Sequence, residues 1–240
     1  MNTKKIYSFI ALLAVATSTV FAEIVEYRTG PFDKLSVRGD INVVYRNLPD
    51  SVGYARYESD RNLDSAIELS ASGGKLTIKE VMTDNHTKPL PTIYVYSDFL
   101  VSATNDGNAT LLLEPGVASP KLSVKLVGNG RIICENVNST QFSAGIETGA
   151  GTIVARGNCH KANFTLMGTG VIQADNLNAV DVNCKVVGTG TIGCRPQSNL
   201  NVKGIGTTKI FYYGTPVIKK MGGARIEHLE EGELPEALEQ

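Results

Sequence analysis

Apolar and polar residues alternate along most of the chain, and a Gly-x-small triplet interrupts this alternation about every 20 residues. When the first glycine of each triplet is numbered zero, position +4 is aliphatic in every copy and position +3 is mostly polar. The aliphatic residues at +4 are Leu111, Ile132, Ile153, Ile172, Ile192, Ile210 and Ile226. Successive side chains of a β-strand point to opposite sides, so this period predicts strands with one buried face.

The constant spacing of the triplets predicts a stacked repeat. Their first glycines are Gly107, Gly128, Gly149, Gly168, Gly188, Gly206 and Gly222. About 20 residues at roughly 3.3 Å each give a perimeter of roughly 66 Å, enough for three short strands and their corners. The expected fold is all-β: a single-stranded, right-handed parallel β-helix, or β-solenoid, with about 20 residues per coil.

A second apolar column precedes each glycine at position −4, and lysines recur at −3. The −4 residues are Val124, Phe164, Cys184, Val202 and Ile218, and the lysines are Lys125, Lys185, Lys203 and Lys219. In the third copy Gly145 occupies −4, and one extra residue in a β-bulge would place Ala144 there instead. We therefore expect a bulge in that strand and a solvated lysine column outside the solenoid.

The chain divides into a targeting segment, a β-helix domain and a tail. Residues 1–22 combine a basic start, an apolar run and a small-x-small pattern ending at Ala22, which together predict a secretory signal peptide. The domain is expected over 23–227, with irregular coils and a cap to about 104 and regular coils over 105–227. Residues 228–240 are acidic and lack period-two patterning, so we expect a short cap followed by disorder.

Composition narrows the classes of partner. The formal net charge is −1 and the sequence indicates no basic patch, so nucleic acid is not expected as a partner. No apolar run after the signal peptide approaches the length of a membrane span. Cys134 and Cys194 share a column but lie three coils apart, roughly 14 Å, which exceeds the limit of about 7 Å for a disulfide. The cysteines are therefore interpreted as buried free thiols.

No set of residues with catalytic spacing is found. The histidines, His86, His160 and His228, lie in distant segments without the spacing of metal ligands. The carboxylates of Glu135, Asp175 and Asp181 fall near corners and form no recurring pair. The sequence therefore predicts no enzyme activity, no cofactor and no metal site, and it assigns no binding residue.

Several of these motifs together resemble a known family. They are the Gly-x-Ile-x-Val segment at 39–43, the Gly-x-Leu-x-Ile segment at 74–78, the Gly-x-Gly-x-Ile coils, and the closing segment at 213–217. The chain resembles the putative auto-transporter adhesin, head GIN domain family of secreted bacterial proteins, common in Bacteroidetes. The resemblance covers nearly all of the chain after residue 22. It implies a β-helix-like domain, and the family name implies adhesion.

The leading functional hypothesis is a non-enzymatic exported solenoid of the periplasm, cell surface or medium. Its outward Thr, Asn and Lys columns would bind a surface glycan or another envelope protein. One alternative is a polysaccharide lyase or hydrolase on the same scaffold. Another is a passive structural or assembly module.

Overall fold

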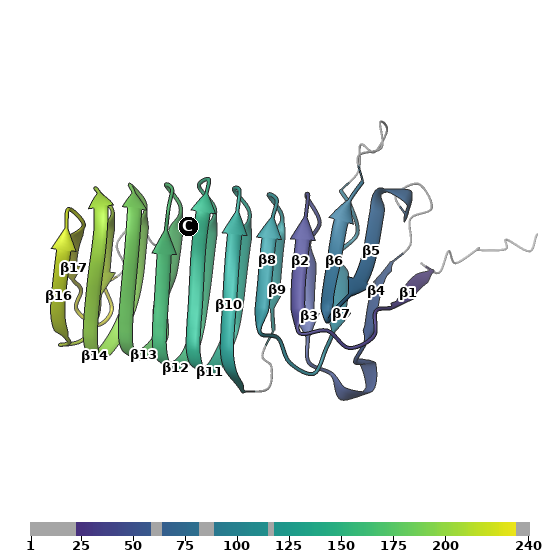
Figure 1. The fold of residues 1–240 in the computed structure, drawn as a ribbon, viewed down its shortest axis with the longest axis horizontal. Helices are drawn as coiled ribbons and strands as arrows, with labels where there is room; N and C mark the ends of the chain where they lie inside the picture. Colours follow the sequence, from purple (N-terminus) through teal and green to yellow (C-terminus); the bar gives the residue numbers. More distant parts are fainter. Residues whose placement is uncertain (1–22, 59–63, 82–88, 115–117, 234–240) are drawn as a thin grey trace, which may run out of the picture.

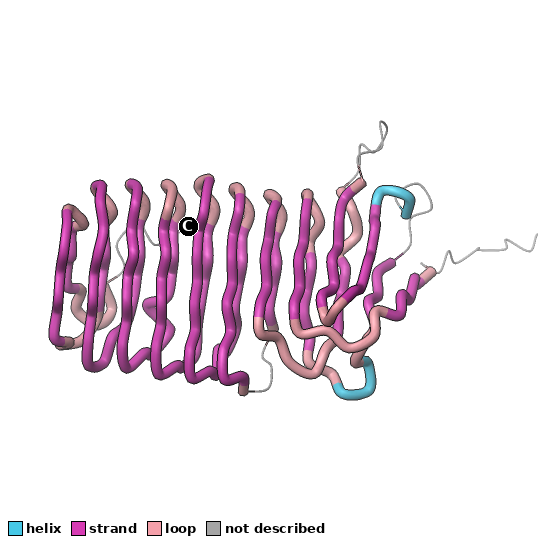
Figure 2. The backbone as a smooth tube through the Cα atoms, in the orientation of Figure 1, coloured by secondary structure: helices cyan, strands magenta, loops and turns pink. Residues whose placement is uncertain are grey.

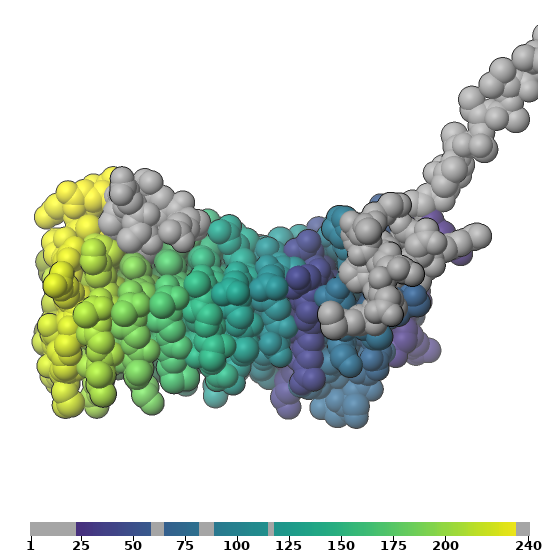
Figure 3. Space-filling view, turned by 90° about the horizontal axis from the view of Figure 1, so that it is seen from above, coloured from purple at the N-terminus to yellow at the C-terminus, as the bar shows by residue number. Residues whose placement is uncertain are grey.

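A single elongated core runs through one 17-stranded sheet that winds round it (Figure 1). The computed structural model describes residues 23–58, 64–81, 89–114 and 118–233. The predicted signal peptide, residues 1–22, lies outside these residues. In a space-filling view onto the turns, the coils are stacked side by side along the molecule (Figure 3).

The regular coils form from long strands, of which β11 to β14 each pass through most of one turn of the solenoid. These strands are β10 (Ser119–Val127), β11 (Arg131–Thr148), β12 (Thr152–Leu166), β13 (Val171–Gly188) and β14 (Thr191–Gly206). The last coils contain β15 (Lys209–Tyr212), β16 (Val217–Gly222) and β17 (Arg225–His228). Every pairing among them is parallel, and each strand pairs with the coil before it. The predicted parallel β-solenoid is confirmed.

Each coil bends in three places, as the predicted perimeter requires. In the pairing of β11 with β12, the register is interrupted after Cys134. Further along the same two strands, Thr140 and His160 are left out of the pairing. The third bend is the glycine turn, where the strands end in short loops along one edge of the molecule (Figure 2). Three short segments therefore enclose the core.

The aliphatic column at +4 forms a continuous ladder through the core. Consecutive members pair with one another from Leu111 to Ile226, and all except the terminal Ile226 are fully buried. On the facing wall, Val124 pairs with Ala144 and Ala144 with Phe164. The register shifts after Leu126, where Glu147 is the extra residue. The predicted bulge is therefore confirmed.

The last coil departs from the expected register. Ile218 pairs with Leu200 instead of Val202, and Lys219 pairs with Asn201 instead of Lys203. The assignment of Ile218 and Lys219 to the −4 and −3 columns was wrong. The cause is a shorter turn, because Gly222 stacks on Gly204 while the ladder beyond the turn keeps its register.

The first coils do not stack in chain order. The coil of β2 (Lys34–Arg38) and β3 (Val43–Arg46) lies between two later coils. On one side are β6 (Lys75–Glu80) and β7 (Ile93–Tyr96). On the other are β8 (Ser102–Asp106) and β9 (Thr110–Leu113), which continue into the regular coils. The first strands therefore lie inside the stack.

Antiparallel strands close the N-terminal end of the core. β1 (Ile24–Arg28) pairs with β4 (Tyr54–Glu58), β4 with β7, and β5 (Ile67–Ser72) with β6. Two short 3-10 helices, η1 (Pro49–Ser51) and η2 (Asp64–Ala66), connect these strands at the same end (Figure 2). Because the direction of pairing changes here, the parallel stack ends in a cap.

The beginning of the acidic tail folds back over the outside of the last coils. Leu229 packs against Val171 and Phe211, and its backbone N–H donates to the carbonyl of Tyr212 at 2.9 Å. Glu231 pairs with Arg195. This part of the tail covers apolar side chains on a side wall. The disorder expected further on falls at residues 234–240, outside the described residues.

Candidate functional site

One outward face of the solenoid carries two adjacent columns of small polar and lysine side chains, which we call the polar face. The first column is Lys75, Lys34, Ser102, Ser123, Ser143, Asn163, Asn183, Asn201 and Lys219. The second is Thr77, Ser36, Thr104, Lys125, Gly145, Thr165, Lys185, Lys203 and Met221. The face spans β6, β2, β8, β10 to β14 and β16, which face the viewer in Figure 1. These positions alternate with core residues and point outward, although Ser36 on β2 is itself buried.

An asparagine ladder orders the middle of the polar face. The side-chain amide of Asn183 donates to Oδ1 of Asn163 at 3.2 Å, and that of Asn201 donates to Oδ1 of Asn183 at 3.1 Å. Asn163 in turn lies 3.5 Å from the hydroxyl of Ser143. Each amide bond uses only part of the donor and acceptor capacity of an asparagine. The ladder therefore holds the remaining donors and acceptors at the spacing of the coils, about 4.8 Å.

The charge on this face has a single sign. Every ionisable side chain in the two columns is a lysine, and Lys125 pairs with Glu147 of the bulge at 2.6 Å. In the adjacent column Asp181 accepts a hydrogen bond from Asn199 at 2.7 Å. The conclusion that the chain lacks a basic patch was wrong, because lysines one coil apart are distant in sequence and adjacent in space. The absence of a nucleic-acid partner, which rested on it, stays a prediction.

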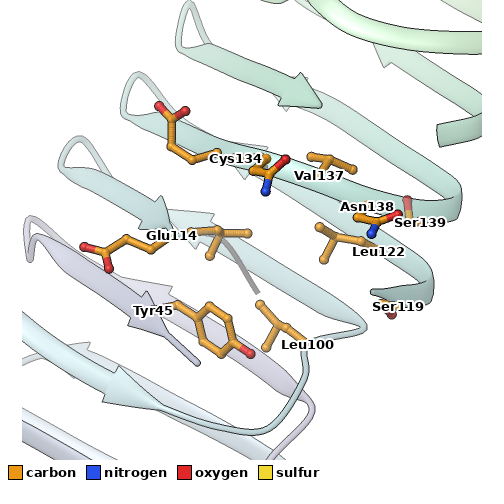
Figure 4. Close-up of a pocket in the computed structure, with 12 residues that line it drawn as sticks. Tyr45, Leu100, Glu114, Ser119, Leu122, Cys134, Val137, Asn138 and Ser139 are labelled. Atoms are coloured by element: carbon orange, nitrogen blue, oxygen red, sulfur yellow. The ribbon is translucent and has the colours of Figure 1, made fainter. Parts of the chain in front are cut away.

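A small cavity opens where the irregular coils meet the regular ones (Figure 4). Its volume is about 50 Å³, and its lining includes Tyr45, Leu100, Leu122 and Val137. Burial raises the pKa of Tyr45 to about 12, and its hydroxyl donates to the carbonyl of Ser97 at 3.2 Å. Ligand pockets usually have volumes of about 300–1,000 Å³. This cavity is therefore a gap in packing rather than a site for a substrate.

The cysteines are buried and free, as the column spacing predicted. Burial raises the pKa of Cys134, and it raises that of Cys159 to about 11. A hydrogen bond with Cys184 and then burial raise the pKa of Cys194. Cys184 and Cys194 belong to different columns, so a comparison of cysteines within one column could not find this contact. Thiols held protonated in this way are poor nucleophiles.

No group of three or more metal-ligating side chains occurs within the described part of the chain. His160 and His228 lie on different coils, and His86 falls outside the described residues. Glu135 forms an ion pair with Arg156, and Asp175 accepts from its neighbour Asn176 at 3.1 Å. The structure does not bring Glu135, Asp175 and Asp181 together, since Glu135 lies on β11, two coils from β13, and Asp175 and Asp181 lie at separate places along β13.

Comparison with known proteins identifies the family. The model described as putative auto-transporter adhesin, head GIN domain, matches residues 31–216. The chain belongs to this family. The resemblance inferred from the glycine and aliphatic motifs is therefore confirmed for most of the β-helix domain. No curated protein sequence matches the chain significantly.

Solved structures share the fold of this family member. A putative adhesin from Bacteroides fragilis superimposes with a TM-score of 0.76 at 21% identity, covering 86% of this chain and 96% of the other. A putative lipid binding protein from Parabacteroides distasonis gives 0.69 at 20% identity, covering 87% and 96%. A putative adhesin from Parabacteroides merdae gives 0.68 at 19% identity, with the same coverage. Identities this low establish the fold alone.

The polar face was only partly foreseen from the sequence. The columns at −3 and −5 of the regular coils could be read from the glycine register, and Lys125, Lys185 and Lys203 were assigned to one column correctly. The contribution of β2, β6 and β8 was missed, because their order in the stack differs from their order in the chain.

Within the described residues, no helix is long and apolar enough to cross a bilayer.

Proposed function

We propose that the protein is exported and acts at the cell envelope as an adhesin-like binding module without catalytic activity. Its ligand is an extended surface polymer, of which a glycan is the best fit, or a second envelope protein. The binding surface is the polar face. The observation that carries the proposal is the continuous register of the two columns from β6 to β16, in which every residue except Gly145 and Met221 is Ser, Thr, Asn or Lys.

The geometry of the face suits a repetitive ligand. Hydroxyl and amide groups recur at about 4.8 Å along the stack, and the rigid sheet below holds them in place. A polymer lying along the coils would meet equivalent groups at every step, so weak contacts would add without further ordering of the protein. The membership in a family described as adhesins supports this reading.

A binding role fits the chemistry better than turnover. Glycoside cleavage needs a pair of carboxyl groups on either side of the scissile bond. The two columns of the polar face contain no carboxylate, and Asp181 beside them is held by Asn199. A substrate lying on this face would therefore meet lysines and amides but no acid and base pair.

A glycan array and an envelope pull-down with the chain from Glu23 onward test the proposal. We expect retention of a glycan or of one envelope protein without release of products. The variant Ser143→Arg places a bulky side chain in the middle of the face and should abolish retention. The matched control is Thr189→Arg, at an exposed glycine turn beside the face, which should retain the ligand.

Three results would contradict the proposal. Release of shortened glycan would favour a lyase or hydrolase. If neither the array nor the pull-down detected a bound ligand, a passive structural module would be favoured. Equal binding by Ser143→Arg and the unsubstituted chain would move the binding surface away from the polar face.

A further inference from the structure

Exposed aliphatic side chains gather at the C-terminal end of the polar face. Ile205 is 77% exposed and Met221 is 66% exposed. Val187 pairs with Ile205 in the next coil, and Val217 lies on β16 at the end of the stack. Soluble proteins rarely leave neighbouring aliphatics this open without a partner.

Lysines lie among these aliphatics. Lys185 pairs with Lys203, and Lys203 pairs with Met221. On β16, Lys219 pairs with Asn201 of the polar face, and the next residue, Lys220, pairs with Val202 and is exposed because the coil is the last of the stack. Within the described residues none of these lysines forms an ion pair, whereas Lys125 further along the face does. We call the set the basic–aliphatic patch: Lys185, Val187, Lys203, Ile205, Val217, Lys219, Lys220 and Met221.

The patch contains a depression with the donors for an anionic group. Its volume is about 330 Å³, and it is lined by Asn183, Asn201, Val202, Lys203, Lys219, Lys220 and Met221. Three lysines and two asparagines are among its lining residues, and no carboxylate lines it. An anion entering the depression would meet donors on several sides, while the aliphatics remain at its edge.

We propose that the basic–aliphatic patch docks the solenoid on an anionic phospholipid bilayer. A lipid phosphate would occupy the depression between the lysines, while Ile205 and Met221 enter the boundary between headgroups and acyl chains. Basic residues near a membrane add to the hydrophobic contribution of buried aliphatics. The patch shares Lys185, Lys203, Lys219 and Met221 with the polar face, so a bilayer would occupy the C-terminal end of that face and a polymer the part before it.

Two other occupants fit less well. An acidic polysaccharide would satisfy the lysines but would leave Ile205 and Met221 exposed to water. A second copy of the chain, packed patch to patch, would bring unpaired lysines against lysines, which is unfavourable. A bilayer with anionic headgroups satisfies both the charge and the apolar side chains.

Co-sedimentation of the chain from Glu23 onward, which contains the whole described fold, tests the proposal. We expect binding to vesicles of phosphatidylcholine with one third phosphatidylglycerol, weakened by salt, and no binding to phosphatidylcholine alone. The triple variant K203Q/K219Q/K220Q should bind about a hundredfold more weakly, since each of the three lysines contributes about fivefold. The variant I205S/M221S keeps the charge and should also lose about tenfold.

The matched control is K34Q/K75Q, at the other end of the polar face, which should bind vesicles within about twofold of the unsubstituted chain. Circular dichroism confirms that each variant is folded. The proposal is overturned if the unsubstituted chain does not bind the anionic vesicles, or if K34Q/K75Q loses as much binding as the patch variants. It is also overturned if I205S/M221S binds vesicles normally, and binding of polygalacturonate to that variant would then assign the patch to an acidic glycan.

Discussion

At the scale of single residues, the turn glycines are required by the neighbouring coil as much as by their own backbone. Gly149 has a positive φ of 88°, which favours glycine by itself. Gly170 has no such conformation, yet a Cβ placed on it would lie 2.4 Å from the carbonyl oxygen of Gly151 in the preceding coil. The repeated glycines therefore permit the close approach of stacked turns.

Substitution of Gly170 by Ala tests this explanation. The added methyl group would also lie 2.8 Å from Cδ1 of Ile146, so we expect the free energy of unfolding to fall by about 1–3 kcal/mol. Gly145 is the control, because its nearest neighbour would be 3.9 Å away. Gly145→Ala should be neutral or stabilising by up to about 1 kcal/mol. Urea denaturation of both variants measures the difference, and equal effects would contradict the stacking argument.

Tyr45 predicts a loss of stability at high pH. Burial raises its pKa from 10.0 to about 12, so the folded protein keeps a proton that the unfolded chain releases. Stability from this group is therefore complete below pH 10 and is lost as pH rises through about 12. Cys159, with a pKa raised to about 11 by burial, acts in the same direction.

The variant Tyr45→Phe removes the tyrosine contribution. At neutral pH it should be slightly less stable, because the hydrogen bond to the carbonyl of Ser97 is lost. Its melting temperature should then fall less steeply than that of the unsubstituted chain above pH 10. If the melting temperatures of the two proteins fell in parallel above pH 10, Tyr45 would have the same pKa in the folded and unfolded states, contrary to this prediction.

At the scale of elements, the strands are held by their place in the ladder. Strands β11 to β14 each contribute an isoleucine to one column and an apolar residue to the facing wall. Each strand therefore buries its apolar side against the coils before and after it, and an isolated coil could not do so. Stability is expected to depend on nearest neighbours along the stack.

Ile172→Asp tests the ladder. Ile172 is fully buried and pairs with Ile153 and Ile192, so the substitution would bury a carboxylate without a partner. We expect a loss of about 4 kcal/mol or more, enough to unfold the domain. Gln173→Asp introduces the same charge at the next, partly exposed position and should cost much less. An unchanged melting temperature for Ile172→Asp would refute the register of β13.

At the scale of the whole molecule, the solenoid combines a cap, a stack of coils and one long polar face. The antiparallel strands close one end of the core, and the tail from Leu229 covers part of a side wall. The polar face runs the length of the stack and ends in the basic–aliphatic patch. On the two proposals, a polymer would lie along the stack before the patch, and a bilayer would lie against its C-terminal end.

Engineered disulfides test the order of the coils. Lys34 pairs with Ser102 across β2 and β8, a separation of about 4.8 Å that suits a disulfide. Lys75 pairs with Lys34 from the other side, so it lies about 9.6 Å from Ser102. We expect K34C/S102C to lose its two added thiols on oxidation and K75C/S102C to keep them. If the coils were stacked in chain order, K75C/S102C would form the cross-link instead. Counting free thiols in denaturant distinguishes the two orders of the coils.

The sequence by itself determined the coil. The contacts within and between coils repeat at a fixed spacing along the chain. The glycine period, the aliphatic column at +4 and the alternation around it can therefore be recognised from the sequence. The bulge at Glu147 was predicted for the same reason, because one extra residue disturbs a strict alternation. The last coil was misread when its turn became shorter and the spacing on its two sides no longer agreed.

Only the tertiary structure decided the order of the first coils and the character of the surfaces. The position of β2 between β6 and β8 depends on contacts between segments far apart in the chain, and no local pattern encodes them. Lys185 and Lys203 of the polar face are separated by a whole coil in sequence and by one strand spacing in space. Their charges and the exposed Ile205 and Met221 therefore become a surface only when the coils stack.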